Sequence, residues 1–282
     1  MFLFKTIAAL QQHLQGVRKR NKPIGFVPTM GALHKGHGSL VMHSLERGHY
    51  TVVSIYVNPT QFNDPKDLER YPRPVSEDLA FLNDLECDVV FLPSDEEIYP
   101  ETGLKTPSVD LGHLGNTLEA AFRPGHFEGV LQIMNRLLDI VSPEYLYMGL
   151  KDLQQMAVVR LLIREMEYSC RLIGLPIVRE SHGLAGSSRN ERLSEEDRNQ
   201  ASIIYKTLQE TSAHFPHLSL AELKKAAMDR LEQPPFRPEY FEFVCTDDLR
   251  IISSKEDCQG TVSVVTAVWC GDVRLIDNME MR

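Results

Sequence analysis

Two histidines, His34 and His37, are separated by a lysine and a glycine and follow a short apolar run at residues 23–27. We expect that run to form a buried strand and residues 39–48 to form a helix, which places the histidines between them. Ligands of open α/β sheets bind beyond the carboxyl ends of the strands, helix N-termini attract anions, and Gly36 lets a phosphate or ribose approach the backbone. The segment therefore predicts a phosphate-handling site. Half of a zinc site and a structural histidine pair remain as alternatives.

The roles of several other polar side chains cannot be inferred from residue type alone. Ser187, Ser188 and Arg189 follow one another in a glycine-containing loop. Hydroxyls and a guanidinium can bind phosphate oxygens, but such a run is more often a solvated turn. Gln61 and Gln155 offer donor and acceptor atoms without competing as nucleophiles, although an isolated glutamine usually just faces water. Spacing alone leaves both pairs of alternatives open.

Strands alternate with helices through the first 178 residues. Residues 51–57 are nearly all apolar and rich in β-branched side chains, as expected of a strand covered on both faces of a parallel sheet. The same reading predicts helices at residues 4–20, 76–85, 129–141 and 153–168, and strands at 88–92, 145–148 and 171–178. The alternation predicts the α/β class, with a doubly wound, Rossmann-like parallel sheet.

The pattern changes after about residue 178. Acidic residues follow Ser194 at the start of a predicted helix, and Ser219 with Glu222 matches a capping box. Strands are then predicted at residues 240–245, 261–269 and 273–276. We therefore expect two domains: residues 1–176 form the Rossmann-like domain, and residues 177–282 form a smaller α+β domain that carries the Ser187 loop.

Charge and hydropathy exclude several classes of protein. The 282 residues include 30 Lys and Arg against 39 Asp and Glu, a net charge of -9. That balance argues against a nucleic-acid partner, which needs clustered cations, although a local pocket can still be positive. The apolar stretches are shorter than the roughly 18 residues of a membrane span, and the N-terminus lacks the pattern of a signal peptide. We expect a cytoplasmic protein with no membrane partner.

The cysteines predict neither a metal site nor a disulfide framework. They are odd in number and widely scattered, and no two of them form a C-x-x-C pair. Buried free thiols in a reducing compartment are the expected state. The five positions are Cys87, Cys170, Cys245, Cys258 and Cys270.

Five segments occur in order between residues 26 and 190. They are residues 26–37 (FVPTMGALHKGH), 54–62 (SIYVNPTQF), 122–127 (FRPGHF), 149–155 (GLKDLQQ) and 183–190 (GLAGSSRN). Together they resemble the pantothenate synthetase family of the nucleotidyltransferase superfamily. The first is similar to the HIGH motif and the last to the loop counterpart of the KMSKS motif.

The resemblance implies an AMP-forming ligase of pantothenate biosynthesis, on the route to coenzyme A. ATP would adenylate the carboxylate of (R)-pantoate, and the amine of β-alanine would then displace AMP. A related nucleotidyltransferase or AMP-forming ligase acting on another small carboxylic acid is the alternative. The family also implies Mg²⁺ and a homodimer. The ligands of Mg²⁺ stay unassigned, with Asp78 as a guess.

The resemblance also assigns roles residue by residue. His37, His34 and Lys151 are the implied catalytic residues, since positioned donors and cations stabilise the charge on a transferring phosphate. The implied ATP-binding residues are Met30, Gly31, His34, His37, Gly149, Lys151, Asp152, Val178, Gly186, Ser187, Ser188 and Arg189, and the implied pantoate and β-alanine residues are Gln61, Gln155, Asn58 and Met30. Arg123 and His126 would either contact an anion or brace their loop.

Four positions depart from the family pattern: Leu150 stands where Glu or Gln is usual, Gly186 replaces a Met, Ala120 replaces a Gly, and Gly38 follows the second histidine. None of these departures removes a residue that is assigned to the chemistry. If residue 186 meets adenine through its backbone, glycine would keep that contact and lose side-chain packing. We therefore expect the same reaction with weaker ATP binding.

Overall fold

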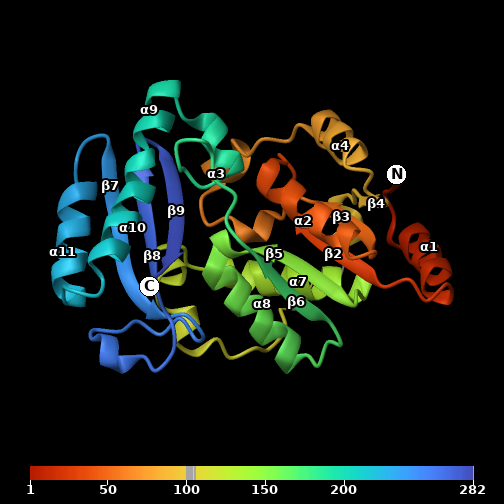
Figure 1. The fold of residues 1–282 in the computed structure, drawn as a ribbon. Helices are drawn as coiled ribbons and strands as arrows, with labels where there is room; N and C mark the ends of the chain where they lie inside the picture. Colours follow the sequence, from red (N-terminus) through yellow and green to blue (C-terminus); the bar gives the residue numbers. More distant parts are fainter. Residues whose placement is uncertain (100–103, 105, 282) are drawn as a thin grey trace.

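A six-stranded parallel sheet forms the larger part of the molecule (Figure 1). The computed structural model describes residues 1–99, 104 and 106–281. The strands lie in the order β1-β4-β3-β2-β5-β6. Their bounds are β1 (Phe2–Phe4), β2 (Ile24–Thr29), β3 (Tyr50–Ile55), β4 (Val89–Phe91), β5 (Tyr145–Gly149) and β6 (Arg171–Leu175). The chain winds outward from β2 in one direction through β3 and β4, and in the other through β5 and β6. The predicted doubly wound α/β fold is confirmed.

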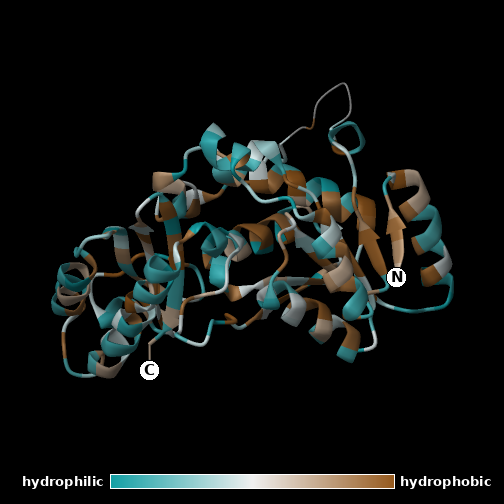
Figure 2. Cartoon of the chain, turned by 90° about the horizontal axis from the view of Figure 1, so that it is seen from above, coloured by the Kyte–Doolittle hydropathy of each residue, from teal (hydrophilic) through white to brown (hydrophobic). Residues whose placement is uncertain are grey.

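Helices cover both faces of this sheet because each strand sends alternate side chains to opposite sides. Phe26 of β2 and Val52 of β3 pack in one cluster with α1 and α7, whereas their neighbours Val27 and Val53 pack in another with α2 and α4. In Figure 2 the strands beside the N-terminus are mostly hydrophobic, and polar residues gather on the outer helices. The helices up to β6 are α1 (Ile7–Lys19), α2 (Lys35–Glu46), α3 (Pro65–Glu69), α4 (Val75–Asp84), α5 (Asp95–Ile98), α6 (Glu119–Phe122), α7 (His126–Val141) and α8 (Leu153–Glu165).

A three-stranded antiparallel sheet forms the C-terminal part, at the left of Figure 1. Its strands are β7 (Phe236–Cys245), β8 (Val262–Cys270) and β9 (Val273–Glu280). The helices α9 (Glu195–Gln200), α10 (Ser202–His214) and α11 (Leu220–Leu231) precede it. The predicted capping box of Ser219 and Glu222 begins α11, and Ser194 caps α9. The smaller α+β unit is therefore present as expected.

The sheet reverses its winding direction between β2 and β5, which pair in parallel through Gly25–Tyr145 and Phe26–Leu146. In open α/β sheets this reversal leaves a crevice beyond the carboxyl ends of the two strands. The segment after β2 holds His34 and His37, and the segment after β5 holds Lys151. The topology alone therefore brings the three predicted catalytic residues to one place.

The predicted helix from residue 4 begins too early. Residues 2–4 instead form β1, which pairs with β4 through Phe2–Val89 and Phe4–Phe91. α1 starts at Ile7, where the Thr6 side chain caps the helix. A three-residue strand at the sheet edge, with Phe2 56% exposed, is too short to show the periodicity of a buried strand.

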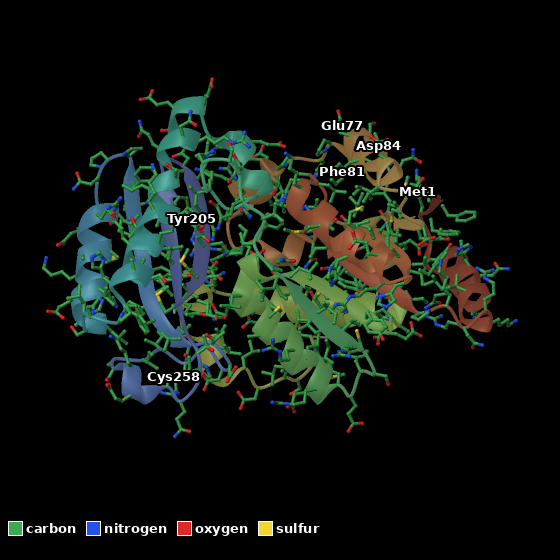
Figure 3. The ribbon with its side chains drawn as sticks, viewed as in Figure 1. Met1, Glu77, Phe81, Asp84, Tyr205 and Cys258 are labelled. Atoms are coloured by element: carbon green, nitrogen blue, oxygen red, sulfur yellow. A yellow bond between two sulfur atoms is a disulfide. The ribbon has the colours of Figure 1, made fainter. Side chains whose placement is uncertain are left out.

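The prediction of free cysteines is wrong for one pair. Cys245 at the end of β7 is bonded to Cys258, which lies at the lower left in Figure 3. The segment after β7 turns back so that their Cα atoms lie 5.5 Å apart, within the range of a disulfide. The two cysteines are 13 residues apart in the sequence, and this spacing alone does not predict the turn. Cys87, Cys170 and Cys270 are free thiols.

A buried carboxylate, Glu119 of α6, joins the N-terminal part of the chain to the antiparallel sheet. Its two oxygens accept hydrogen bonds from Arg274 of β9 at 2.7 and 2.8 Å, and one also accepts from the Tyr240 hydroxyl of β7 at 2.7 Å. Burial opposes ionisation of Glu119, but the hydrogen bonds and charge of Arg274 outweigh it and hold the pKa at about 2. The carboxylate therefore stays charged, and it ties β9 to the segment before α7.

We predict that Glu119→Gln lowers the free energy of unfolding at pH 7 by about 3 kcal/mol, because it removes the buried carboxylate that binds two nitrogens of Arg274 and leaves only Glu239 to pair with that arginine. The folded pKa lies below the ordinary 4.5, so the difference from wild type is full above pH 4.5 and shrinks as pH falls towards 2. Urea unfolding at several pH values measures it. Glu210→Gln removes an exposed ion pair with Arg230 and should cost less than about 1 kcal/mol. Equal losses for the two variants would contradict the role of Glu119.

Candidate active site at the carboxyl edge of the parallel sheet

The two histidines begin α2 by capping it with their rings. His34 is the N-cap, and its Nδ1 accepts the backbone N–H of Gly36 at 3.1 Å. In return, Nδ1 of His37 accepts the backbone N–H of His34 at 3.4 Å. This is a capping box made by imidazoles in place of the usual hydroxyl and carboxylate. Because both Nδ1 atoms accept, a neutral ring must carry its proton on Nε2.

Both rings are held neutral. Burial, and then the charge of Lys151, lower the pKa of His34 to about 4. Burial, then His34 and Lys151, lower that of His37 to about 3. The ring centroids lie 4.2 Å apart, so a charge on either ring would also oppose one on the other. The pair is therefore a set of two uncharged N–H donors.

Asp78 holds the segment that leads to the histidines. Its Oδ2 and Oδ1 accept the backbone N–H groups of Ala32 and Leu33 at 2.9 and 2.6 Å, and the residue is 2% exposed. Gly31 adopts φ +78, and a Cβ there would lie 2.9 Å from Asp78 Oδ2. Asp78 is thus a structural carboxylate rather than a metal ligand. Gly31 makes the turn and does not line the cavity described next.

A cavity of about 200 Å³ opens at the switch between β2 and β5. Every predicted ATP- or substrate-binding residue except Gly31 lines it, which brings segments from five parts of the chain together. Those residues are Met30, His34, His37, Asn58, Gln61, Gly149, Lys151, Asp152, Gln155, Val178, Gly186, Ser187, Ser188 and Arg189.

Lys151 supplies the cation beside the histidines. It lies in the 3-10 turn η3 (Leu150–Asp152) directly after β5, and its Nζ is 3.7 Å from Asp152 Oδ1. Asn278 of β9 donates to the backbone carbonyls of Leu150 and Lys151 at 2.8 and 3.0 Å, which anchors the turn. The Leu150 side chain packs against the main core. Leu150 is therefore not among the residues that line the cavity.

Two glutamine side chains meet across the cavity. Gln61, in the 3-10 turn η1 (Pro59–Gln61), donates from Nε2 to Oε1 of Gln155 at 3.4 Å. The adjacent Gln154 points the other way, accepting from the Glu119 N–H and donating to two backbone carbonyls. Neighbouring helical residues face different directions, so one glutamine of α8 serves the cavity and the other the core.

Asn58 and His126 line the cavity and also brace its wall. Asn58 is 1% exposed; its Nδ2 donates to the Gly129 carbonyl at 3.2 Å and its Oδ1 accepts from Tyr99. His126 contacts the Gln61 carbonyl through Nδ1 at 2.8 Å and Arg123 Nη1 through Nε2 at 3.1 Å. Burial, and then Arg123, lower the pKa of His126 to about 4, so its Nε2 can accept from the guanidinium. In this structure His126 therefore braces the segment that carries Gln61.

At two positions that depart from the family pattern, Gly186 and Gly38, neighbouring atoms leave little room for a side chain. The Gly186 N–H already donates to the Val178 carbonyl at 2.9 Å, and a Cβ at 186 would lie 3.0 Å from that oxygen. The N–H of Gly186 is thus used within the protein. At Gly38, a Cβ would lie 2.8 Å from the ring of Phe81, labelled on α4 in Figure 3. Nothing in the structure explains Ala120.

A second cavity of about 430 Å³ lies against the first, between the parallel sheet and β9. The two share a wall of three cations, a carboxylate and a hydroxyl: Arg123, Lys151, Arg189, Asp152 and Ser187. Ser187 caps the 3-10 turn η4 (Ser188–Arg192), and Ser188 contacts the Tyr71 hydroxyl at 3.2 Å. An anion bound in the first cavity can therefore extend along this wall into the second.

Sequence reasoning missed two residues of the second cavity. Asp67 of α3 accepts from Arg189 and from Arg192, each at 2.8 Å. The pairs are separated by 122 and 125 residues, so no local pattern relates them. The one signal in the sequence was Arg192, a second arginine three positions after Arg189.

A parallel sheet with two uncharged imidazole donors and a row of cations at its carboxyl edge defines an α/β nucleotide-binding protein. The model of one family, pantoate-beta-alanine ligase, matches residues 2–280. The chain belongs to the pantoate-beta-alanine ligase family.

Named relatives are similar to this chain over nearly its full length. A Bacteroides thetaiotaomicron protein named pantothenate synthetase is 44% identical over 100% of this chain and 99% of its own. The crystal structure of pantothenate synthetase from Thermus thermophilus matches with a TM-score of 0.92 at 37% identity, covering 99% of both chains. The Francisella tularensis enzyme, complexed with beta-gamma ATP and beta-alanine, matches with a TM-score of 0.81 at 33% identity, covering 99% of this chain and 97% of that one. Membership of another family of AMP-forming ligases is not favoured.

We predict that His34→Ala lowers the free energy of unfolding by about 1 kcal/mol more than His34→Asn, because asparagine is a good N-cap and alanine is not. Both variants lose the imidazole, so the difference isolates the cap. Urea unfolding at pH 8, where the rings are neutral, measures it. Equal stability of the two variants would show that the ring of His34 does not cap α2.

Proposed function

We propose that this protein condenses (R)-pantoate with β-alanine at the expense of ATP, releasing AMP and pyrophosphate. In the first step a pantoate carboxylate oxygen attacks the α-phosphorus, and the bond to pyrophosphate breaks. In the second, the neutral amine of β-alanine attacks the acyl carbon of pantoyl adenylate, AMP leaves, and the amine loses a proton. Membership of the family and the named relatives support this reaction.

One observation carries the proposal: neutral donors, a cation and paired amides converge on one small cavity. The Nε2–H groups of His34 and His37 suit the oxygens of the α-phosphate, where negative charge grows as the acid attacks. Lys151 adds a fixed positive charge there. Gln61 and Gln155 suit the hydroxyl and carboxylate of pantoate, and Met30 suits its methyl groups. Ser187, Ser188 and Arg189 would hold the departing phosphates.

Mg²⁺ would arrive with ATP. It prefers oxygen ligands and usually binds through substrate phosphates, waters and one or two carboxylates. No group of three or more His, Cys, Asp or Glu residues that could cage a metal occurs among the described residues. Asp152, half exposed on the wall shared by both cavities, is the carboxylate that fits an ion held mainly by phosphate oxygens. The ion would neutralise charge on the nucleotide.

We also propose the division into residues 1–176 and 177–282, a homodimer, and a cytoplasmic location. The end of β6 at Leu175 separates the elements of the two sheets, which supports the division. In the part of the chain that the structure describes, no helix is long and apolar enough to cross a bilayer.

The reaction is tested by pantoate-dependent exchange of labelled pyrophosphate into ATP, followed by AMP release when β-alanine is added. We expect exchange with pantoate alone and net AMP formation only with both substrates. Exchange supported by another carboxylic acid and not by pantoate would overturn the substrate. Formation of ADP in place of AMP would overturn the mechanism.

We predict that His37→Ala and His37→Gln both lower the exchange rate by about 10²- to 10³-fold, the usual cost of removing a positioned donor. Glutamine at this position preserves a capping box, so His37→Gln separates the loss of the imidazole from the loss of the cap. Circular dichroism should show both variants folded. A near-normal exchange rate for His37→Gln would remove the imidazole from the mechanism.

A further inference from the structure

Two arginines of the second cavity converge on a single carboxylate. Nη2 of Arg189 and Nη1 of Arg192 each lie 2.8 Å from a different oxygen of Asp67. The three side chains are 22%, 21% and 24% exposed, so water screens them only in part. Burial opposes ionisation of Asp67, but the hydrogen bonds and charges of Arg189 and then Arg192 outweigh it and hold its pKa below the usual range. Asp67 is therefore an anion bound between two guanidinium groups.

This arrangement has the form of a polyanion site. Guanidinium groups bind carboxylate and phosphate oxygens with the same planar donor geometry, so one anion can replace the other. Arg189 lines both cavities and lies on the wall with Lys151 and Ser187, whereas Arg192 lines only the larger one. Phosphates leaving the α-phosphate position would meet Arg189 first and Arg192 beyond it.

We propose that Arg189 and Arg192 form a pyrophosphate subsite in the larger cavity, and that the carboxylate of Asp67 occupies it in the nucleotide-free protein. The inference rests on the proposed reaction for the identity of the anion. Arg192 is thereby a ligand-binding residue in addition to those assigned above. Asp67 is a built-in competitor, which weakens the binding of pyrophosphate and so favours its release after adenylation.

A purely structural role for Asp67 predicts the opposite behaviour. The two residues that follow α3 also contact the C-terminal part: Tyr71 meets Ser188 at 3.2 Å, and Arg70 lies 4.0 Å from Asp272. If Asp67 only held Arg189 in position, its removal would loosen the arginine and weaken anion binding. If it competes for the arginines, removal frees both and strengthens anion binding.

The test measures the binding of inorganic pyrophosphate by calorimetry, without pantoate or β-alanine, in the full chain. We expect Asp67→Asn to tighten metal-free pyrophosphate binding roughly fivefold or more, as expected for loss of a competing ion pair. Arg192→Gln should weaken binding in the Asp67→Asn background by a similar factor. Because no acyl substrate is present, failure here leaves the proposed reaction untouched, and failure of pantoate-dependent exchange leaves this result untouched.

Asp64→Asn is the matched control. Asp64 lines the same cavity and caps α3 through the N–H of Lys66, a role that asparagine retains. The Asp64→Asn substitution removes one negative charge, as Asp67→Asn does, but three residues away. We expect it to change the affinity for pyrophosphate by less than twofold. Equal tightening in both variants would mean a general charge effect and would overturn the proposal. Weaker binding in Asp67→Asn, with or without Mg²⁺, would overturn it in favour of a structural or metal-binding carboxylate.

Discussion

The capping box at the start of α2 connects the fold of this protein with its chemistry. A helix N-terminus needs acceptors for its free N–H groups, and here the acceptors are the Nδ1 atoms of His34 and His37. Since Nδ1 of each neutral ring accepts a hydrogen bond in this way, Nε2 must carry the proton and act as the donor in the cavity. Burial keeps the rings uncharged, and Asp78 fixes the segment that carries them. The geometry of the donors is thus set by backbone hydrogen bonds made during folding.

The charged side chains around the cavities are also paired with one another. The protein is acidic overall, yet its two cavities share Arg123, Lys151 and Arg189. Several arginines around them are held by carboxylates: Arg274 by Glu119 and Glu239, and Arg189 and Arg192 by Asp67. A buried cation without a partner is costly, so the pairs stabilise the unliganded fold. The difference between them is accessibility. Glu119 is 7% exposed and joins α6 to the antiparallel sheet, whereas Asp67 lies on a short helix at the cavity edge and its side chain is 24% exposed.

Sequence predicted most of the fold because parallel strands covered on both faces appear as apolar runs, as in residues 51–57. The ordered motifs predicted candidate site residues, and the topology brings these residues together at the β2–β5 switch. What it missed depends on long-range contact. The Cys245–Cys258 bond needs the turn after β7, and the Asp67 pairs join residues more than 120 positions apart. The imidazole capping box escaped notice since histidine is not a usual N-cap residue.

The tautomeric state of the two rings tests the central claim most directly. In protein labelled with ¹⁵N-histidine, and assigned with His34→Asn and His37→Gln, NMR distinguishes a protonated ring nitrogen from an unprotonated one. The account predicts that both rings keep the proton on Nε2 from pH 8 down to about pH 5, because the pKa values lie near 4 and 3. A proton on Nδ1 of either ring, or protonation near the ordinary pKa of 6.5, would contradict it.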